Sequence, residues 1–132
     1  MSNRWENLVY NEAYSTQCKV DIMLPDIEGQ YPLFIFFHGG GLEEGSRKDD
    51  QLLYRTLLES GIAVATADYR MYPEARYPDF IEDAAKAVAF VLQHQKQNKR
   101  ISRVYIGGSS AGAYISMMLY FNKKILEKYH ID

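Results

Sequence analysis

The residues with the clearest chemical potential lie in the segment 104–113, which reads Val-Tyr-Ile-Gly-Gly-Ser-Ser-Ala-Gly-Ala. In the frame Gly-x-Ser-x-Gly, Ser110 is the central residue, between Gly108 and Gly112. This spacing is typical of a nucleophile elbow, a sharp strand-to-helix turn that presents a serine in a strained pose. Small flanking residues let the strand and the helix approach without clashes between Cβ atoms. The pattern therefore predicts Ser110 as the nucleophile of an acyl transfer, with the backbone N–H of Ala111 as one oxyanion donor.

A second glycine cluster could supply the remaining oxyanion donors. His38-Gly39-Gly40-Gly41 directly follows an apolar run that reads as a buried strand. Glycines at that point let backbone N–H groups face a substrate with no side chain in the way. For His38 itself, we expect hydrogen bonding that anchors the loop rather than action as a general base. Each cluster alone is a weak signal, but together, each following a buried strand, they are specific.

Two phosphate-binding interpretations of the same glycines fail on particular residues. Residues 107–112 contain the two outer glycines of a Walker loop, but Ala113 stands where the lysine is required. The dinucleotide-binding fingerprint fails because Ser109 occupies its second glycine position. A bound nucleotide is therefore not expected, and the sequence gives no reason to expect a metal or another cofactor.

The elements that must position these residues alternate along the chain. A short strand is expected near 7–10, and a half-exposed strand with period-2 alternation over 18–24. Unbroken apolar runs predict strands buried on both faces, and helical spacing predicts three helices. The buried strands are expected at 33–37, 62–67 and 103–106, and the helices at about 49–60, from 78 through 92, and 111 to about 129. Alternating strands and helices predict an α/β three-layer sandwich: a mostly parallel sheet with helices on both faces.

Two of the helices carry specific burial expectations. In the first, Leu52, Leu53 and Leu57, with Thr56 beside them, should form the buried face. The last helix is apolar on nearly every side as far as Phe121, so its first half should be deeply buried.

Composition restricts the class of protein and its partners. The 132 residues suffice for one domain, expected over 1–132, and 47% of them are hydrophobic. A net charge of −2 gives no reason to expect nucleic acid or an anionic membrane as a partner. The N-terminus lacks the apolar core of a signal peptide, and Cys18 is the only cysteine. A reducing, cytoplasmic location is therefore expected.

Three segments in this order resemble the hormone-sensitive-lipase-like esterase branch of the α/β-hydrolases. They are residues 38–41, residues 68–74 with Tyr77-Pro78 and 82–84 after them, and residues 108–112. The resemblance implies a serine carboxylesterase acting on small acyl esters, a small-molecule partner. It implies oxyanion donors from the N–H groups of Gly40, Gly41 and Ala111, and a structural role for 68–74. An amidase or peptidase with the same machinery stays open, as does a non-catalytic binding or assembly module.

The remaining catalytic residues are the gap in this pattern. In this fold the acid and the histidine follow the serine, yet only 22 residues follow Ser110. His130 would lie roughly 30 Å away along an unbroken helix, and His94 is expected at the wrong end of its helix. We therefore expect the N-terminal part of one α/β-hydrolase domain, weakly active or inactive alone. An excerpt of a longer esterase is favoured over a complete short protein or a sheet completed by a second chain.

The same gap affects association between copies of the chain. The strand before Ser110 would be left as an apolar sheet edge with unpaired backbone groups. The helix after it would likewise lose part of its cover. Self-association through an uncovered sheet edge is therefore expected.

Overall fold

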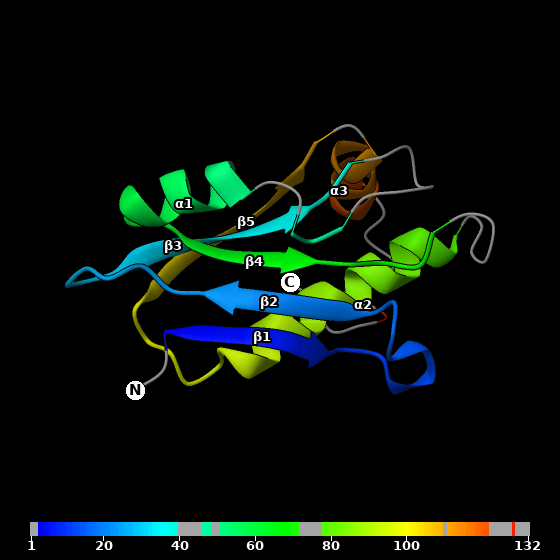
Figure 1. Cartoon of the computed structure of the whole chain (residues 1–132), viewed down its shortest axis with the longest axis horizontal. Helices are drawn as coiled ribbons and strands as arrows, with labels where there is room; N and C mark the ends of the chain where they lie inside the picture. The colour runs from blue at the N-terminus through cyan, green and yellow to red at the C-terminus, as the bar shows by residue number, and fades with distance from the viewer. Residues whose placement is uncertain are drawn as a thin grey trace.

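In a computed structural model of the chain, five strands form one mixed sheet in the order β1-β2-β4-β3-β5 (Figure 1). The structure describes residues 3–39, 46–48, 51–71, 78–109, 111–121 and 128. β1 and β2, and β2 and β4, pair antiparallel, whereas β3 pairs parallel with both β4 and β5. The elements are β1 (Arg4–Val9), η1 (Glu12–Tyr14), β2 (Lys19–Met23), β3 (Tyr31–Phe37), α1 (Gln51–Glu59), β4 (Ala63–Ala67), α2 (Asp79–His94), β5 (Ile101–Gly108) and α3 (Ala111–Phe121). The predicted α/β class is confirmed.

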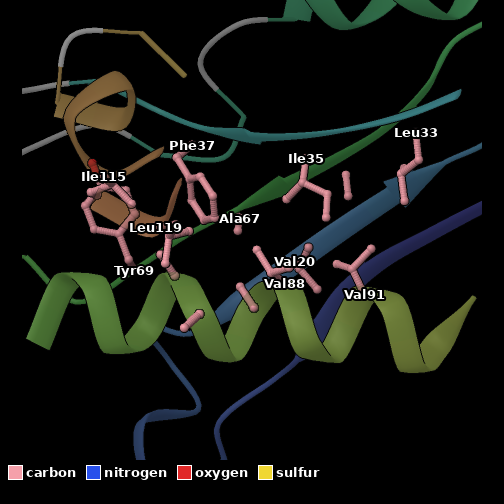
Figure 2. Close-up of a cluster of buried hydrophobic side chains, with 14 of the residues drawn as sticks. Val20, Leu33, Ile35, Phe37, Ala67, Tyr69, Val88, Val91, Ile115 and Leu119 are labelled. Carbon is pink, nitrogen blue, oxygen red and sulfur yellow. The ribbon is translucent and has the colours of Figure 1, made fainter. Parts of the chain in front are cut away.

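Helices cover both faces of the sheet, as predicted. On one face, Tyr54 of α1 packs with Phe36 and Val64. On the other face, α2 and α3 enclose the larger core with the opposite side chains of the strands (Figure 2). Val88, Val91, Ile115 and Leu119 come from these two helices and are fully or almost fully buried. The central strands therefore have apolar cover above and below, which explains why their sequences do not alternate.

β2 differs from the expectation of a half-exposed strand. Four of its five residues are buried, including Asp21, which is 5% exposed. The carboxylate of Asp21 accepts a hydrogen bond from Arg47 Nε at 3.0 Å, and it also accepts one from the Asn7 backbone N–H at 2.8 Å. Because these partners replace water, the polar side chain can face the protein interior. Alternation of polar and apolar residues was therefore a misleading signal of exposure here.

The predicted buried face of α1 is wrong for Leu52, Leu53 and Thr56, and only Leu57 of that set packs against the core. Leu52 is 74% exposed and Leu53 is 39% exposed, whereas Tyr54 is buried. Leu57 and Leu58 pack partly against the same cluster as Tyr54. Positions 54, 57 and 58 share one face of a helix because they are three and four residues apart. An aromatic side chain therefore determines which side of α1 faces the sheet.

β5 and α3 are less buried than predicted. β5 forms an edge of the sheet, and its Val104 and Tyr105 are 39% and 46% exposed. On α3, Ile115 and Leu119 are buried, but Tyr114 and Met117 are 46% and 58% exposed. The cause is the position of these elements at one side of the sheet, where apolar surface on their outer side has no neighbour among the described residues. The expected apolar sheet edge is therefore present.

This edge predicts that the 132-residue chain self-associates, because an exposed apolar edge strand can pair with another chain. Light scattering coupled to size exclusion should show a mass above that of one chain, rising with concentration. Val104→Lys should shift the population towards monomer. Leu52→Lys, which changes an exposed leucine on α1, is the matched control and should leave the mass unchanged. A stable monomer at all concentrations would contradict the prediction.

Cys18 gives a second prediction from the core. Its side chain is fully buried, and burial raises the pKa of the thiol to about 11. The unfolded thiol has a pKa near 8.5, so it loses its proton first as the pH rises. The contribution of Cys18 to stability should therefore be complete below about pH 8 and lost as the pH rises towards 11. Urea titrations of the wild type and Cys18→Ala at several pH values measure this. Rapid reaction of the native thiol with a disulfide reagent at pH 8 would show that the burial is wrong.

Candidate active site

The strand-turn-helix shape required of a nucleophile elbow is present around position 110. β5 ends at Gly108 and α3 begins at Ala111. The backbone N–H of Gly112 donates to the carbonyl oxygen of Ser109 at 2.9 Å, which closes a tight turn between strand and helix. Ser110 itself lies outside the described residues. Its two sequence neighbours are described: Ser109 directly follows β5, and Ala111 is the first residue of α3.

The two glycines that flank the turn pack directly against backbone. A Cβ atom added to Gly112 would lie 1.8 Å from the carbonyl oxygen of Phe37 and 2.8 Å from that of His38. A Cβ added to Gly108 would lie 2.5 Å from the same Phe37 oxygen and 2.5 Å from the carbonyl carbon of Gly112. No side chain fits at either position without backbone movement. Both glycines of the Gly-x-Ser-x-Gly pattern are thus explained by the contact of the turn with the end of β3.

This contact brings the two glycine clusters to one edge of the sheet. Phe37, the last residue of β3, pairs in register with Gly108, and its carbonyl oxygen accepts a hydrogen bond from Ser109 N–H at 3.3 Å. The chain then continues from β3 into His38 and Gly39, beside the turn that leads to α3. Of the predicted oxyanion donors, Gly40 and Gly41 lie outside the described residues. The backbone of Ala111 is placed at the first position of α3.

His38 is held as part of the protein interior. It is fully buried, and its Nδ1 lies 2.7 Å from the carbonyl oxygen of Gly39. A carbonyl only accepts, so the proton is on Nδ1. The ring stacks on Tyr69 with centroids 4.4 Å apart, and the Tyr69 hydroxyl donates to the His38 carbonyl oxygen at 2.8 Å. These contacts agree with an anchoring role for His38 rather than that of a base.

Tyr69 is a residue of the site that the sequence reasoning did not single out. It is 1% exposed, and burial raises the pKa of its hydroxyl above the usual range, so it remains a donor. The resemblance only assigned residues 68–74 to a structural loop, and residues 72–77 lie outside the described ones. A tyrosine after a buried strand carries no local signal of its partner. Its link to His38 spans 31 positions of sequence.

Of the other two histidines, only His94 belongs to the described residues, and its position does not suit a base for the turn. His94 lies at the C-terminal end of α2, with its ring 5.0 Å from that of Trp5. These rings line a cavity together with Tyr31, the first residue of β3. The turn before α3 instead contacts Phe37, the last residue of the same strand. The expectation that His94 sits at the wrong end therefore holds. His130 lies outside the described residues.

Among the described residues, no three or more His, Cys, Asp or Glu side chains are grouped so as to hold a metal ion. Nor does any helix within the described ranges combine the length and the apolar character needed to cross a bilayer.

The chain is similar to known proteins over most of its length. A protein-family model described as BD-FAE matches residues 20–130. The chain is 34% identical over 123 residues to the rice protein named probable isoprenylcysteine alpha-carbonyl methylesterase ICMEL1, covering 92% of this chain and 28% of that protein. It is 36% identical over 100 residues to carboxylic ester hydrolase LipN of Mycobacterium tuberculosis, covering 72% and 26%. The chain thus spans under a third of the length of these relatives.

A solved structure gives the same result for the fold. Esterase B from Lactobacillus rhamnosis superposes with a TM-score of 0.82 at 21% identity, over 98% of this chain and 43% of that one. At this identity the likeness concerns the fold alone. The fold is that of the α/β-hydrolases, as the sequence resemblance implied.

The packing of Gly112 predicts an unusual response to a helix-favouring substitution. Gly→Ala within a helix normally stabilises by about 1 kcal/mol. Gly112→Ala should instead reduce the free energy of unfolding by roughly 3 kcal/mol or more, because its Cβ meets backbone atoms that cannot turn away. Urea denaturation followed by circular dichroism measures the change.

Gly107→Ala is the matched control for this prediction. Its Cβ would lie 2.6 Å from Cζ of the Phe34 ring, the far end of a side chain that can shift. The expected loss is about 1–2 kcal/mol. A neutral or stabilising Gly112→Ala would show that the turn does not pack on β3 as described.

Proposed function

Because the chain belongs to the BD-FAE family, within the hormone-sensitive-lipase-like esterases, we propose that it carries the nucleophile and the oxyanion donors of a serine carboxylesterase acting on small acyl esters. The observation that carries the proposal is the contact of Gly112 with the carbonyl groups of Phe37 and His38. Through it, the Gly-x-Ser-x-Gly turn and the loop that begins at His38 leave the sheet side by side. A nucleophile and a set of oxyanion donors must meet at one substrate carbonyl, and this arrangement supports that.

Each proposed group has a distinct role. Ser110 Oγ attacks the ester carbonyl and passes its proton to a base, forming a tetrahedral intermediate. The N–H groups of Gly40, Gly41 and Ala111 donate to the oxyanion that develops, and one such donor typically contributes roughly 3–4 kcal/mol to the transition state. The N-terminus of α3 adds a favourable dipole for the same negative charge. Collapse of the intermediate releases the alcohol, and water then hydrolyses the acyl-enzyme.

The base and the acid are proposed to come from residues outside these 132. Among the described residues, His38 is enclosed and bonded to Gly39, and His94 lies at the opposite end of β3. Without a base, the rate typically falls by several orders of magnitude. We therefore expect the chain alone to be weakly active or inactive.

The proposed substrate is a carboxylic ester rather than an amide. The rice relative is named as a methylesterase and the mycobacterial relative as a carboxylic ester hydrolase, and this reaction type is what the two names share. An alkoxide leaves more readily than an amine, so an ester also makes the smaller demand on the missing base. A cytoplasmic location is supported by the single, buried Cys18 thiol, which suits a reducing compartment.

Hydrolysis of p-nitrophenyl acetate tests the proposal in this chain and in any longer form of the protein. Ser110→Ala should reduce kcat of the active form at least about 1,000-fold, because it removes the nucleophile. Ser109→Ala is the matched control: it changes the adjacent hydroxyl while keeping the backbone N–H that donates to Phe37. It should retain most of the activity. Activity that survives Ser110→Ala would exclude the nucleophile assignment.

A further inference from the structure

The segment Asp68–Arg70, which directly follows β4, contacts both ends of one loop. We call residues 38–47 the glycine loop, since Gly39, Gly40, Gly41 and Gly45 belong to it. Tyr69 bonds to its first residue and Asp68 to its last. We propose that residues 68–70 act as a clamp that positions the glycine loop for oxyanion binding. The catalytic consequence rests on the proposed function, whereas the clamp itself can be tested without it.

The first end of the loop is held by a neutral hydrogen bond and a ring contact. The Tyr69 hydroxyl donates to the His38 carbonyl oxygen at 2.8 Å, and the two rings lie within 10° of parallel. Tyr69 and His38 are both almost fully buried, so water cannot replace either partner. The bond fixes the peptide group that joins His38 to Gly39, immediately before the predicted oxyanion donors.

The second end is held by charge. Asp68 Oδ1 accepts from the Arg47 backbone N–H at 2.7 Å, and Asp68 Oδ2 bonds to the guanidinium of the same residue. The guanidinium, 8% exposed, also contacts Asp21 of β2 at 3.0 Å. The charge of a buried arginine is compensated by its carboxylate partners, and removing one of them lowers the stability of the fold. Backbone and side chain of Arg47 are therefore tied to the same carboxylate.

The clamp is itself fixed to the rest of the fold. Its Asp68 backbone N–H donates to the Lys19 carbonyl oxygen of β2 at 2.8 Å. At its other end, Arg70 forms a forked ion pair with Asp83 of α2, Nε to Oδ2 at 2.9 Å and Nη2 to Oδ1 at 2.9 Å. The Asp83 side chain is fully buried, and its Oδ2 also accepts from the Arg70 backbone N–H at 2.8 Å. A segment fixed to β2 and α2 can hold His38 and Arg47, the two loop residues that it contacts.

The pattern of partners distinguishes a clamp from ordinary core packing. Consecutive residues of one segment bond to opposite ends of one loop, and each bond is to a polar group of that loop. Oxyanion donors act best when they are already oriented before the reaction, because no reorganisation is then needed. The bonds that are described fix the loop at His38 and at Arg47, the two ends between which the proposed donors lie in the sequence.

Amide hydrogen exchange of the peptide 38–48 tests the clamp with or without catalytic activity. Tyr69→Phe keeps the ring and removes only the hydroxyl, and we expect exchange in this peptide to become about tenfold faster. Tyr31→Phe is the matched control. Tyr31 is 2% exposed, and its hydroxyl accepts from Asn98 Nδ2 at 3.0 Å at the other end of β3. It should leave exchange of 38–48 unchanged, and equal exchange in the two variants would overturn the clamp.

Kinetics of an active form test the consequence for catalysis. Tyr69→Phe should lower kcat for p-nitrophenyl acetate about tenfold while KM changes less than about twofold, since the donors act mainly in the transition state. Asp68→Asn, which weakens the hold on Arg47, should give the same split. Tyr31→Phe is again the control: if its melting temperature is similar to that of Tyr69→Phe, it should keep the kcat of the wild type. Unchanged kcat in Tyr69→Phe would overturn the positioning role.

The two proposals fail in distinguishable ways. Activity that persists in Ser110→Ala rejects the nucleophile and leaves the exchange result to decide on the clamp. Loss of activity in Ser110→Ala, together with wild-type exchange and kcat in Tyr69→Phe, supports the nucleophile and rejects the clamp.

Discussion

The close backbone contact between α3 and the end of β3 is the constraint on which the arrangement of the site depends. Gly112 packs against the carbonyl groups of Phe37 and His38, and Gly108 packs against Gly112 and the same Phe37 carbonyl. Because neither glycine has a Cβ atom, the turn between β5 and α3 can lie directly beside the start of the glycine loop. Packing thus requires the two glycines of the Gly-x-Ser-x-Gly pattern, in addition to the catalytic role proposed for the serine between them.

A buried polar network extends from this contact towards the rest of the sheet. The neutral Tyr69–His38 bond and the charged Asp68–Arg47 pair hold the two ends of the glycine loop. Asp21 pairs with both Arg47 and Lys48, so two carboxylates face two cations. Such groups are costly to bury unless every partner is present. His38, Arg47, Asp68 and Tyr69 belong to no strand or helix, so these side-chain bonds, rather than a backbone ladder, connect them. The outer side of β5 and α3, by contrast, presents apolar side chains to solvent.

Local sequence patterns predicted the strands, the helices and the turn between the last strand and the last helix. The features that were missed depend on contacts between residues far apart in the sequence. Apolar runs indicated β3 and β4, and glycine spacing indicated the turn at Ser110, because both signals depend on neighbouring residues. The burial of Asp21 depends on Arg47, 26 positions away, so alternation in β2 wrongly indicated exposure. The partner of Tyr69 was hidden for the same reason. Ser110, Gly40 and Gly41 are proposed from the sequence pattern and from the family to which the chain belongs.

Identification of the residue that reacts with a fluorophosphonate most directly tests the central claim, that this chain carries the nucleophile of an esterase at the turn before α3. The reagent is applied to the form of the protein that hydrolyses p-nitrophenyl acetate, and the adduct is located by tandem mass spectrometry of its peptides. The account predicts a single adduct on Ser110, with loss of hydrolysis in proportion to labelling. An adduct on another residue, or full hydrolysis by protein labelled at Ser110, would contradict it.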